Sequence, residues 1–315
     1  MNGARYSYLR RICKLVEQGK DIVIVSEDYA APMFDDFRVN YPNRFLSVGI
    51  AEQNGVAVAC GLTLEGKYPI VYGCAPFPLT RAIDQLKSAG AGMHLPMTIL
   101  NSGIGFGVPE FGATHYNIDD ISMARGIPGV RIITPSDNIM AEQLADYSIE
   151  NKGPLYVRFD KNSEGELYKT QEISFNRGFN LLSDLGAKSN IVIISCGFML
   201  REMHDLAQNM CDEGIFAKVI DLYSLPFNER ELLDTISDLP VITVEEHIIQ
   251  GGIGSAVLET LNIYNHKNMI TRIGVNFKDC YPSVSGSREY FVKMYGLTPD
   301  DVAKTAKKIV DAEKH

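Results

Sequence analysis

Short runs rich in β-branched residues recur along this chain with helical segments between them, and the runs are apolar throughout rather than alternating. Strands of this kind are buried on both faces, which is typical of a mostly parallel sheet covered by helices. Ten runs fit the pattern: 21–26, 44–48, 68–73, 96–101, 130–135, 154–159, 190–196, 216–222, 240–246 and 269–275. The predicted helices are 4–18, 51–65, 79–92, 117–125, 136–150, 198–213, 228–236, 252–265, 287–296 and 299–312. The pattern predicts an α/β protein.

The alternation lapses after residue 160, where a polar, turn-rich stretch continues to residue 189. Such a lapse is typical of a domain boundary. The 315 residues are also enough for two hydrophobic cores. We therefore predict a first domain at 1–160, a linker at 161–189 and a second domain at 190–315, each domain with a mostly parallel sheet flanked by helices.

Charge and composition exclude several classes of protein. The net charge is −9 and no long Lys/Arg run occurs, which argues against nucleic acid or an anionic membrane as a partner. No apolar run approaches the roughly 18 residues that a membrane-spanning helix needs. The six cysteines lie far apart, without metal-ligand spacing, so we expect neither a disulfide framework nor a structural metal. We expect a cytoplasmic protein.

Glu52 stands where the apolar segment 45–62 turns from strand to helix. An acid in the first turn of a helix ordinarily complements the helix dipole, by about 0.3–1 kcal/mol. The residues before Glu52, Val48 to Ala51, and the residues Gly55 to Val58 after it have few polar side chains, however. A carboxyl in such a setting can remain protonated and donate a hydrogen bond.

The glycine-rich segment 101–117 follows a predicted strand and contains His115. Its glycines match neither the dinucleotide fingerprint nor the phosphate-binding loop. A loop this long at the carboxyl end of a strand is usually either functional or disordered, and histidine is the side chain that most readily moves protons near neutral pH. His115 is therefore a candidate for proton transfer.

Two further segments carry charged residues. In 76–94, Arg81 and Asp84 have the spacing of an ion pair on one helix face, which is ordinarily structural. In 245–261, two acids and a histidine precede two glycines and a helix. Helix N-termini attract anions, but we favour a subunit or domain contact for these acids.

Taken together, the motifs resemble the C-terminal half of a transketolase, a thiamine-diphosphate enzyme that moves two-carbon ketol units between sugars. The matching stretches are RFLSVGIAEQNGVAVACGL, LTRAIDQLK, FGATH, RIITPSDN, KGPLYVRF and VEEHIIQGGIGSAV, in the family's order over nearly the whole chain. The GDG motif, through which the family's other half binds the diphosphate and its metal, does not occur here. The chain thus resembles the second subunit of a split transketolase, with a pyrimidine-binding domain and a C-terminal domain.

The resemblance implies cofactor, partner and site residues. It implies thiamine diphosphate, with Mg²⁺ or Ca²⁺ bound by a partner subunit that carries the diphosphate-binding domain, in an α2β2 assembly active only when complete. It implies that Glu52 hydrogen-bonds a ring nitrogen of the aminopyrimidine and that His115 assists proton transfers on sugar hydroxyls. Arg5 matches an arginine that contacts substrate phosphate, and Asp28 matches an acid near the substrate channel. Ile50 is the other residue of the strand-to-helix turn expected at the cofactor.

Several positions depart from the family pattern. The aromatic residue that stacks on the pyrimidine aligns with Pro78, and Phe77 stands one residue earlier. Three substrate-contacting positions hold Asn101, Phe111 and Lys161 instead of the family's histidine, aspartate and arginine. Altered substrate contacts beside an intact cofactor acid predict the same chemistry on a different sugar, with another anionic end group or hydroxyl pattern.

Other interpretations remain open at this point. The β subunit of a 2-oxoacid dehydrogenase shares the two domains and the catalytic acid, but GIAEQN, GATH and PSDN are closer to transketolase wording. A deoxyxylulose-phosphate synthase fragment and a non-catalytic assembly subunit are further alternatives. A flavodoxin-like nucleotide binder is disfavoured because no dinucleotide fingerprint occurs.

Overall fold

The computed structural model describes residues 3–27, 32–161, 167–168, 172–276, 281 and 284–313. Chain contacts divide it into two compact units, the first being Met1–Val108 with Thr114–Ile173 and the second Pro109–Ala113 with Ser174–His315. The segment 161–189, predicted as a linker, includes strand β7 (Asn180–Ser183) of the second unit. The domain limits drawn from the sequence stay a prediction.

The first unit is built on a parallel sheet whose strands follow the order β5-β6-β4-β3-β1-β2. Its strands are β1 (Ile22–Ser26), β2 (Phe45–Ser47), β3 (Tyr68–Cys74), β4 (Met97–Ser102), β5 (Arg131–Ile133) and β6 (Pro154–Phe159). Every residue of β1, β4 and β6 is buried, as uniformly apolar strands require.

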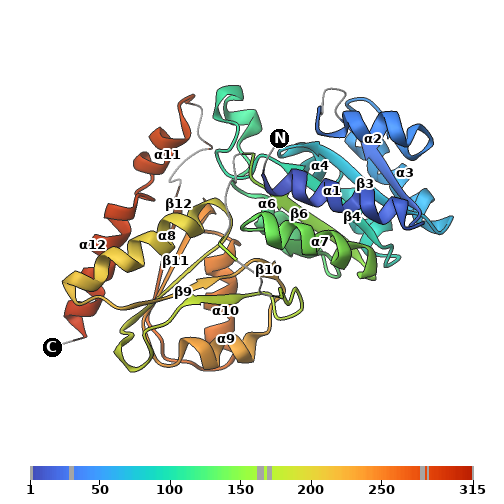
Figure 1. The fold of residues 1–315 in the computed structure, drawn as a ribbon. Helices are drawn as coiled ribbons and strands as arrows, with labels where there is room; N and C mark the ends of the chain where they lie inside the picture. Colours follow the sequence, from blue (N-terminus) through green and yellow to red (C-terminus); the bar gives the residue numbers. More distant parts are fainter. Residues whose placement is uncertain are drawn as a thin grey trace. The chain divides into compact units, whose positions relative to one another are not determined.

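Helices cover this sheet, and α1 and α7 lie side by side on it (Figure 1). The helices are α1 (Ala4–Glu17), α2 (Asp35–Asn40), α3 (Glu52–Leu64), α4 (Phe77–Thr80), α5 (Ile83–Gln85), α6 (Asp120–Arg125) and α7 (Asn138–Glu150). Arg11 of α1 forms a bidentate ion pair with Asp146 of α7. Its Nε and Nη2 atoms donate to the two carboxylate oxygens at 2.7 and 2.5 Å. Asp137 caps α7 by accepting a hydrogen bond from the backbone N–H of Met140, and the helix begins two residues after its predicted start at 136.

The predicted helix 79–92 is broken in the structure. It consists of the short helices α4 and α5 followed by a π-helical turn, η3 (Leu86–Ala91). Gly90 and Gly92 lower the helix propensity at this end, and Arg81 lies between α4 and α5. Arg81 thus stands outside both short helices, as the residue that follows α4.

The second unit has its own sheet, in the order β12-β11-β8-β9-β7. Its elements are β7, β8 (Ile191–Ser195), α8 (Phe198–Asn209), β9 (Ala217–Asp221), β10 (Ser224–Leu225), α9 (Glu229–Ile236), β11 (Val241–Ile248), α10 (Ile253–Ile263), β12 (Ile270–Val275), α11 (Arg288–Met294) and α12 (Pro299–Ala312). All its described pairings are parallel except that of β7 with β9. The predicted α/β class, with two mostly parallel sheets flanked by helices, is confirmed.

None of the helices in the part of the chain that the structure describes is long and apolar enough to cross a membrane.

Candidate active site

The carboxyl ends of the strands in the first unit share one edge of the sheet, because these strands are parallel. Glu27 follows β1 directly, and the turn after β2 leads into Glu52. Phe77 follows β3, and Ser102 ends β4. This edge therefore holds two residues predicted from the sequence, Glu52 and Phe77, together with Glu27 and Ser102.

Glu52 is the first residue of α3 and is only 6% exposed. Gly49 makes the sharp turn before it with φ of 71°, in the left-handed region that suits glycine. The Arg81 Nη1 atom donates a hydrogen bond of 2.7 Å to the Glu52 Oε1 atom. The turn thus holds a buried carboxyl at the head of a helix, as the sequence predicts.

Arg81 corrects two sequence predictions. Glu52 has a charged partner, so the expectation of little polar company around it is wrong. Arg81 pairs with this acid across the fold and not with Asp84 of α5, three residues further along the chain. The spacing of Arg81 and Asp84 suggests a local ion pair only if one helix runs through both, and that helix is broken.

Phe77 and His115 extend the contacts of the Glu52–Arg81 pair. The Arg81 guanidinium lies over the Phe77 ring, 4.0 Å from its centroid. The Phe77 ring meets the His115 ring edge to face, with 4.9 Å between centroids. The Thr114 hydroxyl lies 3.0 Å from His115 Nδ1. The structure therefore brings the two predicted catalytic residues, Glu52 and His115, into one cluster through Arg81 and Phe77.

A second acid that the sequence does not predict lies beside Glu52. Glu27 is only 3% exposed, and neither of its carboxylate oxygens has a hydrogen-bond partner among the described residues. Burial and, next, the charge of Glu52 raise the pKa of Glu27 from its ordinary value of 4.5 to about 9, against the opposing effect of Arg81. At neutral pH Glu27 therefore holds a proton.

Arg5 reaches the same edge of the sheet from α1. Its Nη1 atom donates a hydrogen bond of 3.0 Å to the hydroxyl of Ser102, the last residue of β4. Arg5 is partly exposed, so its remaining donors can meet an anion.

Asn101 lies inside the protein, in a network of buried polar side chains. Its amide donates to the Tyr156 hydroxyl at 2.6 Å, and that hydroxyl donates to Asp120 at 2.8 Å. Arg158 donates to both carboxylate oxygens of the same aspartate, at 2.7 and 2.9 Å. Asn101 is fully buried, so this position gives no support to its predicted contact with substrate.

The other predicted site residues lie at the surface or outside the described part of the chain. Phe111 is 58% exposed and belongs to a short 3-10 turn, η4 (Pro109–Phe111), grouped with the second unit. Lys161, just after β6, is exposed, and Ile50 is 81% exposed. Asp28 lies outside the described residues.

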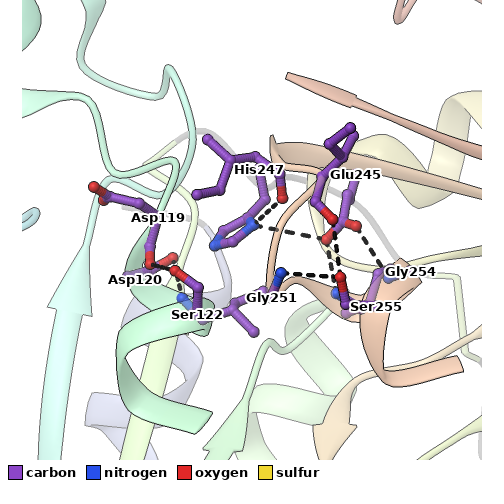
Figure 2. Close-up of polar contacts among 12 residues, drawn as sticks. Asp119, Asp120, Ser122, Glu245, His247, Gly251, Gly254 and Ser255 are labelled. Atoms are coloured by element: carbon purple, nitrogen blue, oxygen red, sulfur yellow. Dashed lines mark hydrogen bonds and ion pairs between the residues drawn. The ribbon is translucent and has the colours of Figure 1, made fainter. Parts of the chain in front are cut away.

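In the second unit, Glu245 of β11 has partners at the start of α10 (Figure 2). Glu245 accepts hydrogen bonds from the backbone N–H groups of Ile253 and Gly254, at 2.7 and 3.0 Å. Glu245 is thus itself the anion at the N-terminus of α10. Glu246 forms a buried pair with Arg288. Both acids have partners within the second unit, and the subunit or domain contact expected for them stays a prediction.

Comparison with known proteins identifies the family. The transketolase pyrimidine-binding domain matches residues 4–165, and the transketolase C-terminal domain matches residues 184–302. The chain belongs to the transketolase family. It corresponds to the half of a transketolase that carries these two domains, as the resemblance implies, and family membership implies thiamine diphosphate as the cofactor.

The relatives of this transketolase chain include proteins named as transketolase subunits. It is 31% identical over 303 residues to an apulose-4-phosphate transketolase subunit of Actinobacillus succinogenes, covering 95% of each chain. It is 27% identical to a 6-deoxy-6-sulfo-D-fructose transketolase subunit of Clostridium sp., covering 98% of this chain and 94% of the other. A solved structure described as a split gene transketolase, inactive beta4 tetramer, matches with a TM-score of 0.84, 28% identity and 98% coverage of both chains.

Proposed function

We propose that this chain is the pyrimidine-binding subunit of a two-subunit transketolase. In this proposal it moves a two-carbon ketol unit from a ketose with an anionic end group to an aldose, and it is active only with a partner subunit. The observation that carries the proposal is the contact chain Glu52–Arg81–Phe77–His115, which gathers a buried acid, an aromatic ring and a proton-transfer group at the carboxyl edge of the sheet.

The residues of this site fit an aminopyrimidine. Arg81 offers a planar, nitrogen-rich group that donates to Glu52 and lies over the Phe77 ring, and an aminopyrimidine whose ring nitrogen carries a proton would make the same two kinds of contact. Phe77 is half-buried with its ring in this cluster, whereas Pro78 is buried against Gly73. This arrangement favours Phe77 as the stacking aromatic.

Each residue has a physical role in this proposal. Thiamine diphosphate, when bound, supplies the nucleophilic carbon and electron sink that cleavage beside a ketose carbonyl requires. Glu52 shares a proton with a ring nitrogen in a site that excludes water, where such a bond is strong. Phe77 covers one face of the ring. His115 moves protons to and from sugar hydroxyls, and Arg5 binds the anionic end of the sugar.

The partner in this proposal carries the diphosphate-binding domain with its GDG motif, and the metal, Mg²⁺ or Ca²⁺, binds there. Two copies of each chain would form an α2β2 assembly. The related solved structure, an inactive beta4 tetramer of a split gene transketolase, supports the expectation that this chain alone does not turn over.

The substrate of this chain is proposed to differ from that of ordinary transketolases. Phe111 and Lys161 replace the family's aspartate and arginine, and Lys161 offers a point charge where an arginine would bind an anion with two parallel hydrogen bonds. The two named relatives act, by their names, on sugars that carry a phosphate and a sulfonate. Both observations support a ketose with an anionic group other than that of xylulose 5-phosphate, or at another position.

Reconstitution tests this proposal. The chain is mixed with a subunit that carries GDG, thiamine diphosphate and Mg²⁺, and ketol transfer is measured on phosphorylated, sulfonated and uncharged ketoses. Turnover is expected only with both subunits present, and only on anionic ketoses. Efficient turnover of xylulose 5-phosphate would refute the altered substrate, and oxidative turnover of a 2-oxoacid with a lipoyl acceptor would refute ketol transfer.

A further inference from the structure

Two glycines make the space that the Glu27 carboxyl occupies. A Cβ atom on Gly55, one turn into α3, would lie 2.6 Å from Glu27 Oε1. A Cβ atom on Gly73 of β3 would lie 2.7 Å from Glu27 Oε2. Both distances are shorter than real Cβ contacts, so any other residue at either position would force Glu27 to move. We call this space, bounded by Gly55 and Gly73, the glycine cradle.

The glycine cradle offers Glu27 no hydrogen-bond donor among the described residues. The charged groups whose fields reach it are Glu52, at the head of α3, and Arg81, after α4. Tyr72 and Cys74 flank Gly73 along β3, so their side chains point to the opposite face of the strand. A carboxyl buried without donors and beside a like charge favours its neutral form.

We propose that Glu27 is a second acid of this site and a positioning residue, which holds a proton in the glycine cradle so that Glu52 carries the negative charge. Two neighbouring carboxyls cannot both ionise in a dry site without a large electrostatic cost. Arg81 stabilises the charge on Glu52, to which it donates directly. The proton therefore stays on Glu27, and the charge stays on the carboxyl that faces Arg81.

The placement of the proton on Glu27 and of the charge on Glu52 affects cofactor binding, and this part of the inference rests on the proposed function. A charged Glu52, with a neutral acid behind it, could accept the hydrogen bond of a protonated aminopyrimidine ring nitrogen, and so share that proton, in the place where it now accepts from Arg81. Above pH 9, Glu27 loses its proton inside a cradle that has no donor among the described residues, next to a second negative charge. The new negative charge on Glu27 disturbs the first turn of α3, which carries both Glu52 and Gly55. Thiamine diphosphate binding should therefore weaken in the alkaline range.

The first test follows the carboxyl groups directly. The full chain is labelled with carbon-13 at the glutamate carboxyl carbon, and the Glu27 signal is assigned with Glu27→Gln and titrated by NMR. Glu27 should stay protonated through neutral pH. In Glu52→Gln its pKa should fall, because a like charge is removed, but it should stay above 4.5 because burial remains. An ordinary pKa for Glu27, or a raised one that Glu52→Gln leaves unchanged, would overturn the proposal.

The second test measures thiamine diphosphate binding by calorimetry in the assembled complex, at about pH 7.5 and pH 9.5. The ratio of the two affinities is compared within each variant. Above the pKa of Glu27, wild type should lose up to about tenfold in affinity for each further pH unit. Glu27→Gln cannot ionise and should not show this loss. Glu65→Gln, at an exposed position just after α3, is the matched control and should behave as wild type.

An equal alkaline loss in Glu27→Gln and wild type would overturn the role of Glu27 at the cofactor. The failure of the proposed function looks different. In that case the wild-type complex binds no thiamine diphosphate at any pH, while the NMR titration still decides whether Glu27 and Glu52 share one proton.

Discussion

Replacing Glu27 by Gln should stabilise the chain, and the gain should grow with pH. An acid whose pKa is higher in the folded than in the unfolded chain stabilises the fold fully below its unfolded pKa, and this contribution is lost as the pH rises toward the folded pKa. For Glu27 the window runs from 4.5 to about 9. A buried amide has the shape of the neutral acid but no proton to lose.

The size of the effect follows from the pKa shift. Each pH unit within the window costs the wild-type chain about 1.4 kcal/mol, because the unfolded chain releases a proton that the folded chain retains. At pH 7, about 2.5 units above the lower limit, the cost is roughly 3 kcal/mol. Glu27→Gln should therefore gain little over wild type near pH 5 and roughly 3 kcal/mol near pH 7.

The assay is urea unfolding of the two chains at equal concentration, at several pH values between 5 and 9. The difference in unfolding free energy between variant and wild type should rise with pH. Glu65→Gln, at an exposed glutamate, should give a flat difference over the same range. A constant difference for Glu27→Gln would show that Glu27 titrates like an exposed acid, and it would refute the reasoning.

Three further predictions concern other contacts. Gly55→Ala should lower the melting temperature because its methyl group clashes with Glu27, and the loss should be largely relieved when Glu27→Ala is added; an equal loss in both backgrounds would contradict the cradle. Asp120→Asn leaves the buried Arg158 without its counter-charge and should cost about 3–5 kcal/mol of unfolding free energy; a cost below about 1 kcal/mol would contradict the pair's burial. Phe77→Ala should weaken thiamine diphosphate binding in the assembled complex by roughly tenfold, and unchanged affinity in calorimetry would argue against stacking.

Most of the fold could be predicted from the sequence because buried parallel strands are apolar on both faces. The runs that became β1, β4 and β6 are of this kind, and their limits differ from the structure by at most one residue. Strand β7 was missed because it is short and lies in a polar segment. Helix α2 was missed for a similar reason, since its six residues DDFRVN have no apolar period.

The candidate site could be predicted only where local sequence carries the signal. Glu52 stands at a strand-to-helix turn and His115 in a long glycine-rich loop, and both patterns are visible along the chain. The burial of Glu27 depends on Gly55 and Gly73, which come from other elements, so an acid after β1 resembles an ordinary loop residue. One signal was available: a strand buried on both faces runs straight into this acid.

Arg81 shows how local spacing can mislead. Its distance along the chain from Asp84 fits a helical ion pair, but the helix is broken between them and the side chain crosses to Glu52. Tertiary contacts of this kind are invisible to a periodicity argument. They determine which acid of the site meets a cation.

The most direct measurement is the rate of ketol transfer by the assembled two-subunit complex carrying Glu52→Gln. A glutamine cannot exchange a proton with a ring nitrogen, so the rate should fall by roughly 10²–10⁴-fold. Assembly should stay intact, and the Glu65→Gln complex should keep the wild-type rate. If the Glu52→Gln complex assembles and turns over at the wild-type rate, this acid has no catalytic role and the chain serves only to build the complex.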